Sequence, residues 1–69
     1  MAGQFNVVDF VMENHGSVVH FIPQTAAAEA IMQEMGLESW QMWGKGFVVD
    51  WRQAGHMVEA LVDTGYSVK

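Results

Sequence analysis

The spacing of apolar residues near the start of the chain predicts a β-hairpin. In an extended conformation, residues 5–12 carry apolar side chains on both faces, which is typical of a strand with one face on a core and the other against a second layer or subunit. Residues 13–16 interrupt this pattern with turn-favouring Asn and Gly. Residues 17–22 then resume a run rich in β-branched and aromatic side chains. We expect a hairpin over residues 5–22.

A first helix is expected over residues 25–35, where the apolar residues follow a 3.6-residue period. Thr25 is placed to cap its N-terminus, because a threonine hydroxyl accepts a hydrogen bond from a backbone N–H of the first turn. Gly36 followed by Leu37 has the form of a Schellman ending, with glycine in the left-handed conformation. The stripe expected to face a core consists of Ala28, Ile31, Met32 and Met35.

A second helix is expected over residues 51–64. Asp50 and Gln53 have the spacing of a capping box, in which each side chain satisfies a backbone N–H of the first turn. Gly65 and Tyr66 repeat the glycine-plus-apolar ending of the first helix. Its apolar stripe consists of Ala54, Met57, Val58, Leu61 and Val62.

A second hairpin is expected between the helices, over residues 39–49. Apolar residues alternate on both sides of the spacer at residues 44–46, whose sequence Gly-Lys-Gly is short and flexible enough to reverse the chain. The tryptophan-bearing half of this segment is alternatively an irregular loop.

These elements predict an α+β fold in a single domain over residues 1–69. The economical arrangement is a two-layer ββαββα architecture, with a four-stranded, mainly antiparallel sheet and both helices on one face. The other face of the sheet stays uncovered in a monomer. We expect it to carry some of Val8, Phe10, Met12, Val18 and Val48, together with a tryptophan.

The amino-acid composition predicts that the protein associates with a partner. A chain of 69 residues without cysteine must be held together by packing alone. A domain near this size buries only about 60% of the surface of its unfolded chain. Yet 51% of the residues are hydrophobic, and they include three tryptophans. Because this is more apolar material than so small an interior encloses, we expect a homodimer or another protein partner.

The charge excludes two classes of partner. Eight acidic residues against three basic ones give a formal net charge of -5, which repels nucleic acid and anionic membranes. The first residues lack the basic and apolar regions of a signal peptide, and no apolar run approaches the ~18 residues of a membrane span. We expect a cytoplasmic protein.

Candidate catalytic and metal-binding motifs are weak. The chain has three histidines, but no pair has the close helical spacing of a zinc-binding H-E-x-x-H motif. No serine lies in a Gly-x-Ser-x-Gly elbow, and the Walker spacing for phosphate binding is missing. We therefore expect no catalytic site, no metal site and no cofactor.

The residues selected as interaction candidates are mostly aromatic. Trp40, Trp43 and Trp51 cluster within twelve positions, and tryptophan is enriched at interface hot spots. Arg52 is the only arginine, and it can pair with a carboxylate at the helix start or with a carboxylate of a partner. Phe10 completes the set, as a residue of the sheet face expected to be uncovered.

Several short motifs are spread over most of the chain. They are Asn14-His15-Gly16-Ser17, Pro23-x-Thr25-x-x-Ala28, Trp43-Gly44, Phe47-Val48-Val49-Asp50, Arg52 and Gly65. Together they resemble a group of short uncharacterised proteins found in bacterial and bacteriophage genomes. Ala26 departs from the pattern of that group, which favours proline after the capping threonine, and so does Trp51, where the group favours His or Pro. The resemblance implies a phage or prophage origin and adds no chemistry.

Two functions follow as hypotheses. The first is a noncatalytic protein-interaction module that associates with itself through the open sheet face or the tryptophan segment. The second is an acidic, phage-encoded inhibitor that mimics nucleic acid in the groove of a host enzyme. The modest density of charge, 16% of residues, favours the first.

Overall fold

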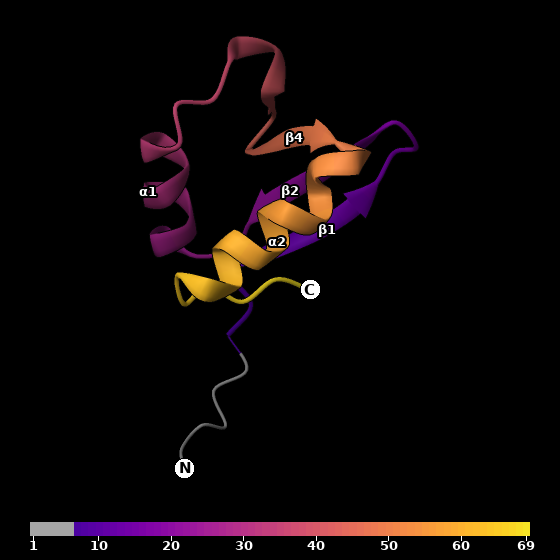
Figure 1. Cartoon of the computed structure of the whole chain (residues 1–69). Coiled ribbons are helices and arrows are strands. Elements are labelled where there is room, and N and C mark those ends of the chain that lie inside the picture. The colour runs from indigo at the N-terminus through magenta and orange to yellow at the C-terminus, as the bar shows by residue number, and fades with distance from the viewer. Residues whose placement is uncertain (1–6) are drawn as a thin grey trace.

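Two β-hairpins and two helices alternate along the chain in the computed structural model, which describes residues 7–69 (Figure 1). The strands form one antiparallel sheet in the order β1-β2-β4-β3. The predicted α+β fold in the order β-β-α-β-β-α is confirmed. The elements are β1 (Phe10–Asn14), β2 (Val18–Pro23), α1 (Ala26–Glu34), the 3₁₀ helix η1 (Ser39–Gln41), β3 (Met42–Trp43), β4 (Gly46–Asp50), the 3₁₀ helix η2 (Trp51–Gln53) and α2 (Ala54–Asp63).

The turn of the first hairpin is shorter than predicted and sets the register of β1 on β2. The backbone N–H of His15 donates to the carbonyl of Val18 (2.9 Å), so that only Gly16 and Ser17 form the turn. Gly16 has φ 86, which matches the glycine required at the first central position of a type II′ turn. The short turn lets β1 run to Asn14. β1 begins at Phe10, later than predicted, and residues 5 and 6 of the predicted strand lie outside the described residues.

The second hairpin is confirmed only near its turn. β3 has two residues, and Met42 lies opposite Phe47 on β4. The residues before β3 form η1 instead of a strand, as the alternative of an irregular segment allowed. The Gln41 side chain fastens η1, because its Oε1 accepts from the Glu38 backbone N–H (3.0 Å) and its Nε2 donates to the Val48 carbonyl (3.2 Å).

The first helix begins and ends close to the predicted residues. Thr25 is the N-cap of α1, and its Oγ1 accepts a hydrogen bond from the Ala28 backbone N–H (3.0 Å). The same hydroxyl donates to Asp9 Oδ1 (2.7 Å), which ties the helix start to the segment before β1. Gly36 takes the left-handed conformation at φ 69, as its place after the helix requires.

The second helix differs from the prediction at its start and agrees at its end. Asp50 Oδ1 accepts from the backbone N–H of Arg52 (2.9 Å), and the predicted capping box with Gln53 is replaced by the tighter turn of η2. At the C-terminus, Gly65 has φ 104. The Tyr66 N–H donates to the Leu61 carbonyl (2.9 Å) and the Gly65 N–H donates to the Val62 carbonyl (3.0 Å), which is the Schellman pattern.

The core lies between the sheet and both helices and is built on three phenylalanines. The rings of Phe21 and Phe47 stack with centroids 5.1 Å apart, and Phe10 meets Phe47 edge to face at 6.0 Å. These aromatic geometries add to the energy of burial itself. The buried residues of this cluster are Phe10, Val19, Phe21, Ala28, Met32, Phe47, Val49 and Leu61.

The predicted exposure of Phe10 is therefore wrong. Phe10 is 0% exposed and belongs to the helix-facing side of the sheet, where it also meets the ring of Tyr66 at 6.4 Å. The register decides this, because Phe10 lies opposite Pro23, two residues along β2 from the core residue Phe21. Both faces of residues 5–12 are apolar, so periodicity alone did not distinguish the two sides.

The C-terminal tail covers the outer edge of β1. The Lys69 N–H donates to the Phe10 carbonyl, and the Met12 N–H donates to the Lys69 carbonyl, both at 2.9 Å. Asp9 secures the junction, because its Oδ2 accepts from the Ser67 N–H (2.9 Å). This edge of the sheet is thus occupied by the chain itself, which protects it from pairing with another strand.

We expect Gly16→Ala to destabilise the fold by about 1–2 kcal/mol, because a side chain in the left-handed region clashes with its own backbone. Gly55→Ala is the matched control. No atom lies within 4 Å of a Cβ at Gly55 in α2, which lacks a positive φ, so alanine there is expected to stabilise by up to about 1 kcal/mol. Urea denaturation measures both free energies. Equal effects of the two substitutions would contradict the turn assignment.

Phe10→Ala is expected to abolish cooperative unfolding. Removing a buried phenylalanine ring costs about 3–5 kcal/mol, which equals the stability that one core of this size supplies. Val62→Ala, at a residue that is 52% exposed, is expected to change stability by no more than about 0.5 kcal/mol. Thermal unfolding followed by circular dichroism measures both, and a wild-type transition in Phe10→Ala would show that the ring is not in the core.

Candidate functional site

The sheet face opposite the helices carries a cluster of polar and aromatic side chains. Glu13 on β1 lies directly opposite His20 on β2. Because successive side chains of a strand point to opposite faces, both residues point away from the core that their neighbours Met12 and Phe21 face. No helix covers this side in the described part of the chain, so the chemistry of the open face depends on these residues.

Four residues form what we call the imidazole cluster: Glu13, His15, His20 and Trp43. Glu13 Oε1 lies 3.4 Å from His15 Nε2 and 3.8 Å from His20 Nδ1. The Trp43 ring centroid lies 5.4 Å from that of His15 and 5.6 Å from that of His20. One carboxylate and two imidazoles therefore converge at the end of the first hairpin, beside an indole from the second hairpin.

His20 is held in place by backbone contacts from the second hairpin. Its Nε2 lies 3.1 Å from the Trp43 carbonyl oxygen, which can only accept a hydrogen bond. In the neutral imidazole, this contact places the proton on Nε2 and leaves the lone pair on Nδ1, the nitrogen that faces Glu13. Gly46 makes the arrangement possible, since a Cβ there would lie 2.9 Å from His20 Nε2 and would collide with the Phe21 carbonyl.

His20 and Trp43 meet across β4. β4 lies between β3 and β2 in the sheet, and the His20 side chain reaches over it at Gly46 to the backbone carbonyl of Trp43 on β3. Val48 on β4 is directly opposite His20 and is 1% exposed, although it faces away from the helices. The cluster thus shields a second, small apolar region, while Trp43 itself stays 40% exposed.

The other two tryptophans lie on the 3₁₀ helices. Trp40 in η1 is 59% exposed and Trp51 in η2 is 58% exposed. The structure therefore brings Trp43 together with two histidines, and it places Trp40 and Trp51 at the surface on either side of the second hairpin in sequence. Phe10, the fourth aromatic candidate, is buried on the opposite face.

Arg52 forms an ion pair with Asp50 of the same chain. Its Nε donates to Asp50 Oδ1 (3.1 Å) and its Nη2 donates to Asp50 Oδ2 (3.2 Å), a two-pronged pairing at the start of η2. The hydrogen bond from the Arg52 side chain, aided by the one from its backbone N–H, lowers the pKa of the Asp50 carboxyl below its ordinary value of 3.8. Of the two roles proposed for Arg52, pairing at the helix start is the one observed.

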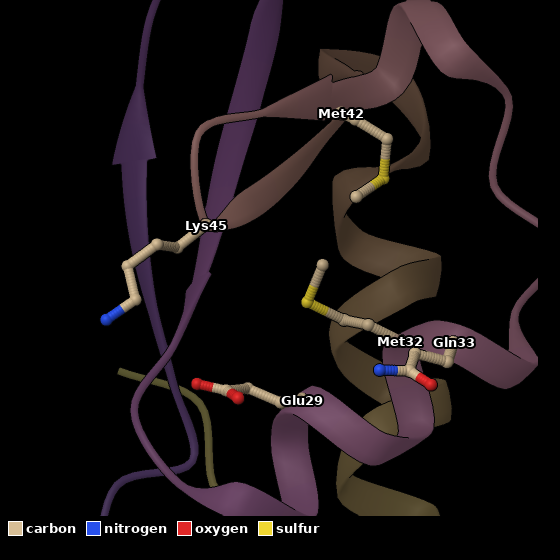
Figure 2. A pocket seen from close by; sticks show the side chains of 5 residues that line it. All are labelled: Glu29, Met32, Gln33, Met42 and Lys45. Atoms are coloured by element: carbon tan, nitrogen blue, oxygen red, sulfur yellow. The ribbon is translucent and has the colours of Figure 1, made fainter.

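A hollow of about 260 Å³ lies between α1 and the second hairpin. Figure 2 shows the thioethers of Met32 and Met42 pointing toward one another across it, with Glu29 and Lys45 on one side. Its volume is below the roughly 300–1,000 Å³ of typical small-molecule sites.

Comparison with protein families, with curated proteins and with solved structures found no match to this chain. The resemblance to short bacterial and bacteriophage proteins therefore stays a prediction. Within residues 7–69, neither helix has the length and apolar character needed to cross a lipid bilayer.

The imidazole cluster was not predicted from the sequence. None of the histidines has the helical spacing of a zinc motif, whereas Glu13, His15 and His20 meet across a hairpin. The usable signal was the Gly16-Ser17 pair. A two-residue turn at that place puts His15 opposite Val18 and hence Glu13 opposite His20.

We expect Arg52→Gln to raise the pKa of Asp50 toward 3.8, though not fully, since the backbone N–H at position 52 still donates to it. A carboxyl with a lowered pKa in the folded chain stabilises the fold above its unfolded pKa, and this stabilisation disappears as the pH falls through the folded pKa. The variant therefore loses less stability on acidification. NMR titration of the Asp50 carboxyl carbon measures the pKa, and Lys45→Gln is the control of equal charge. An unchanged pKa in Arg52→Gln would contradict the pairing.

Proposed function

We propose that the protein is a cytoplasmic, noncatalytic interaction module that associates with a second copy of itself through its tryptophan arm, residues 39–43. The observation that carries this proposal is the exposure of the arm. Trp40 is 59% exposed, Met42 48% and Trp43 40%. Aromatic and methionine side chains are enriched at protein–protein interfaces, and three of them are exposed within these five residues.

The edges of the sheet support association through side chains and not through strand addition. The C-terminal tail covers the outer edge of β1. On the other side, β3 pairs with the first residues of β4, and the Gln41 side chain occupies the Val48 carbonyl farther along. A partner that docks here would therefore contact indole and thioether side chains and not unpaired backbone donors and acceptors.

The hollow next to the arm supports a reciprocal contact. Met42 belongs both to the arm and to the wall of the hollow, which Met32 lines from α1. In a two-fold dimer the same patch faces itself. The Trp40 side chain of each copy would then enter the hollow of the other, with the flexible methionine side chains adapting to the indole.

The size of the surface predicts a weak dimer. A tryptophan buries roughly 150–250 Å² when fully enclosed, so an indole that is about half exposed offers on the order of 100 Å². Stable interfaces bury about 800 Å² on each partner. The two tryptophans of the arm can therefore form the centre of an interface and not the whole of it, and association is expected in the micromolar range or above.

Sedimentation velocity from about 1 µM to about 500 µM tests the proposal, because it covers the range of weak association. We expect the average mass to rise from that of a monomer, 7.7 kDa, toward twice this value. Trp40→Ala is expected to keep the monomer mass throughout, since it removes the side chain that fills the hollow. Val62→Ala, a second exposed apolar site at 52%, is the control and should associate like the wild type.

A wild-type protein that remains monomeric at the highest concentration would rule out self-association. Equal weakening by Trp40→Ala and Val62→Ala would show that association is nonspecific and does not depend on the arm.

A further inference from the structure

The imidazole cluster has the donor set of a transition-metal site. Glu13 Oε1, His15 Nε2 and His20 Nδ1 all lie within 4.8 Å of one another. Two imidazole nitrogens and one carboxylate oxygen are ligands that Zn²⁺ and related divalent ions bind in proteins. We propose that Glu13, His15 and His20 bind a divalent first-row transition-metal cation, with Zn²⁺ as its representative.

The distances are close to those of a formed site. With metal–ligand bonds of about 2.0–2.1 Å in a tetrahedral arrangement, ligand atoms lie about 3.3 Å apart. Glu13 Oε1 lies 3.4 Å from His15 Nε2 and 3.8 Å from His20 Nδ1. The remaining adjustment brings the two imidazole nitrogens together. Side-chain rotation of His15 supplies it, because that side chain is 41% exposed and lies at a hairpin turn.

The environment of His20 provides the strongest argument. Metal-binding histidines generally donate their second ring N–H to a carbonyl or carboxylate, which orients the ring and directs the lone pair at the metal. His20 Nε2 makes this contact with the Trp43 carbonyl at 3.1 Å, and Nδ1 faces the carboxylate that would share the ion. The His20 side chain is only 15% exposed, so this ligand is positioned before any metal arrives.

The donor set also selects the class of metal. Ca²⁺ and Mg²⁺ prefer oxygen ligands, whereas two of the three donors in the cluster are imidazole nitrogens. Three protein ligands leave at least one coordination position, which opens to solvent because the Glu13 side chain is 54% exposed. Water, or a donor group of another molecule, can occupy it. The formal net charge of -5 also favours the approach of cations.

Isothermal titration calorimetry of the untagged full chain with ZnCl₂ tests the site. We expect one Zn²⁺ per chain, and an affinity lower by at least about 100-fold in His20→Ala and in Glu13→Gln, because loss of a direct ligand costs at least as much as loss of an outer-shell partner. His56→Gln is the matched control, because His56 is an exposed histidine of α2 outside the cluster, and it should bind like the wild type. MgCl₂ should give no binding heat.

A second measurement reports the location of the ion. In the background of Trp40→Phe and Trp51→Phe, Trp43 is the only tryptophan. Co²⁺ bound between the imidazoles should quench its emission, since both imidazole centroids lie within 5.6 Å of the indole. His15→Ala in the same background should remove the quenching. Circular dichroism of each variant shows that it is folded.

Three results would overturn the proposal. The first is a wild-type dissociation constant for Zn²⁺ above about 1 mM. The second is binding that persists in His20→Ala and is lost in His56→Gln. The third is binding without quenching of Trp43. Titration at a concentration where sedimentation finds only monomer separates these results from the test of self-association.

Discussion

The register of the first hairpin is the constraint on which the rest of the structure depends. Gly16 has φ 86 and lets the chain reverse in two residues. This places Met12 opposite Phe21 and Glu13 opposite His20. A slip of one residue would turn every side chain of β1 to the other face, which would expose Phe10 and bury Glu13. Core and imidazole cluster thus depend on the same turn.

The two faces of the sheet are covered in different ways. Two helices cover one face and enclose a stacked pair of phenylalanines with Phe10 at their edge. On the other face, the rings of His20 and Trp43 lie with centroids 5.6 Å apart, and Val48, directly opposite His20, is 1% exposed. In the described residues no helix covers this face, and the side chains of His15 and Glu13 are 41% and 54% exposed there.

The second hairpin connects the two proposed activities. Its arm exposes Trp40 and Met42 beside the hollow, while the next residue, Trp43, supplies the carbonyl that orients His20 and the ring that covers both imidazoles. Trp43 belongs both to the tryptophan arm and to the imidazole cluster, so the proposed interface and the proposed metal site share this residue. A cation that tightens the imidazole cluster would also restrain the arm, so the two properties belong to one region of the surface.

Local signals determined the helices, and tertiary pairing decided the faces. Thr25, Gly36 and the Gly65–Tyr66 ending act on atoms within a few residues of themselves, so their roles were evident in the amino-acid sequence, as was the ββαββα order. The burial of Phe10 and the meeting of Glu13 with His20 depend on which strand lies opposite, and His20 meets Trp43 across β4, which lies between their strands. Such contacts join residues far apart in sequence. Because apolar residues occur on both faces of the first strand, only packing decides which face is buried.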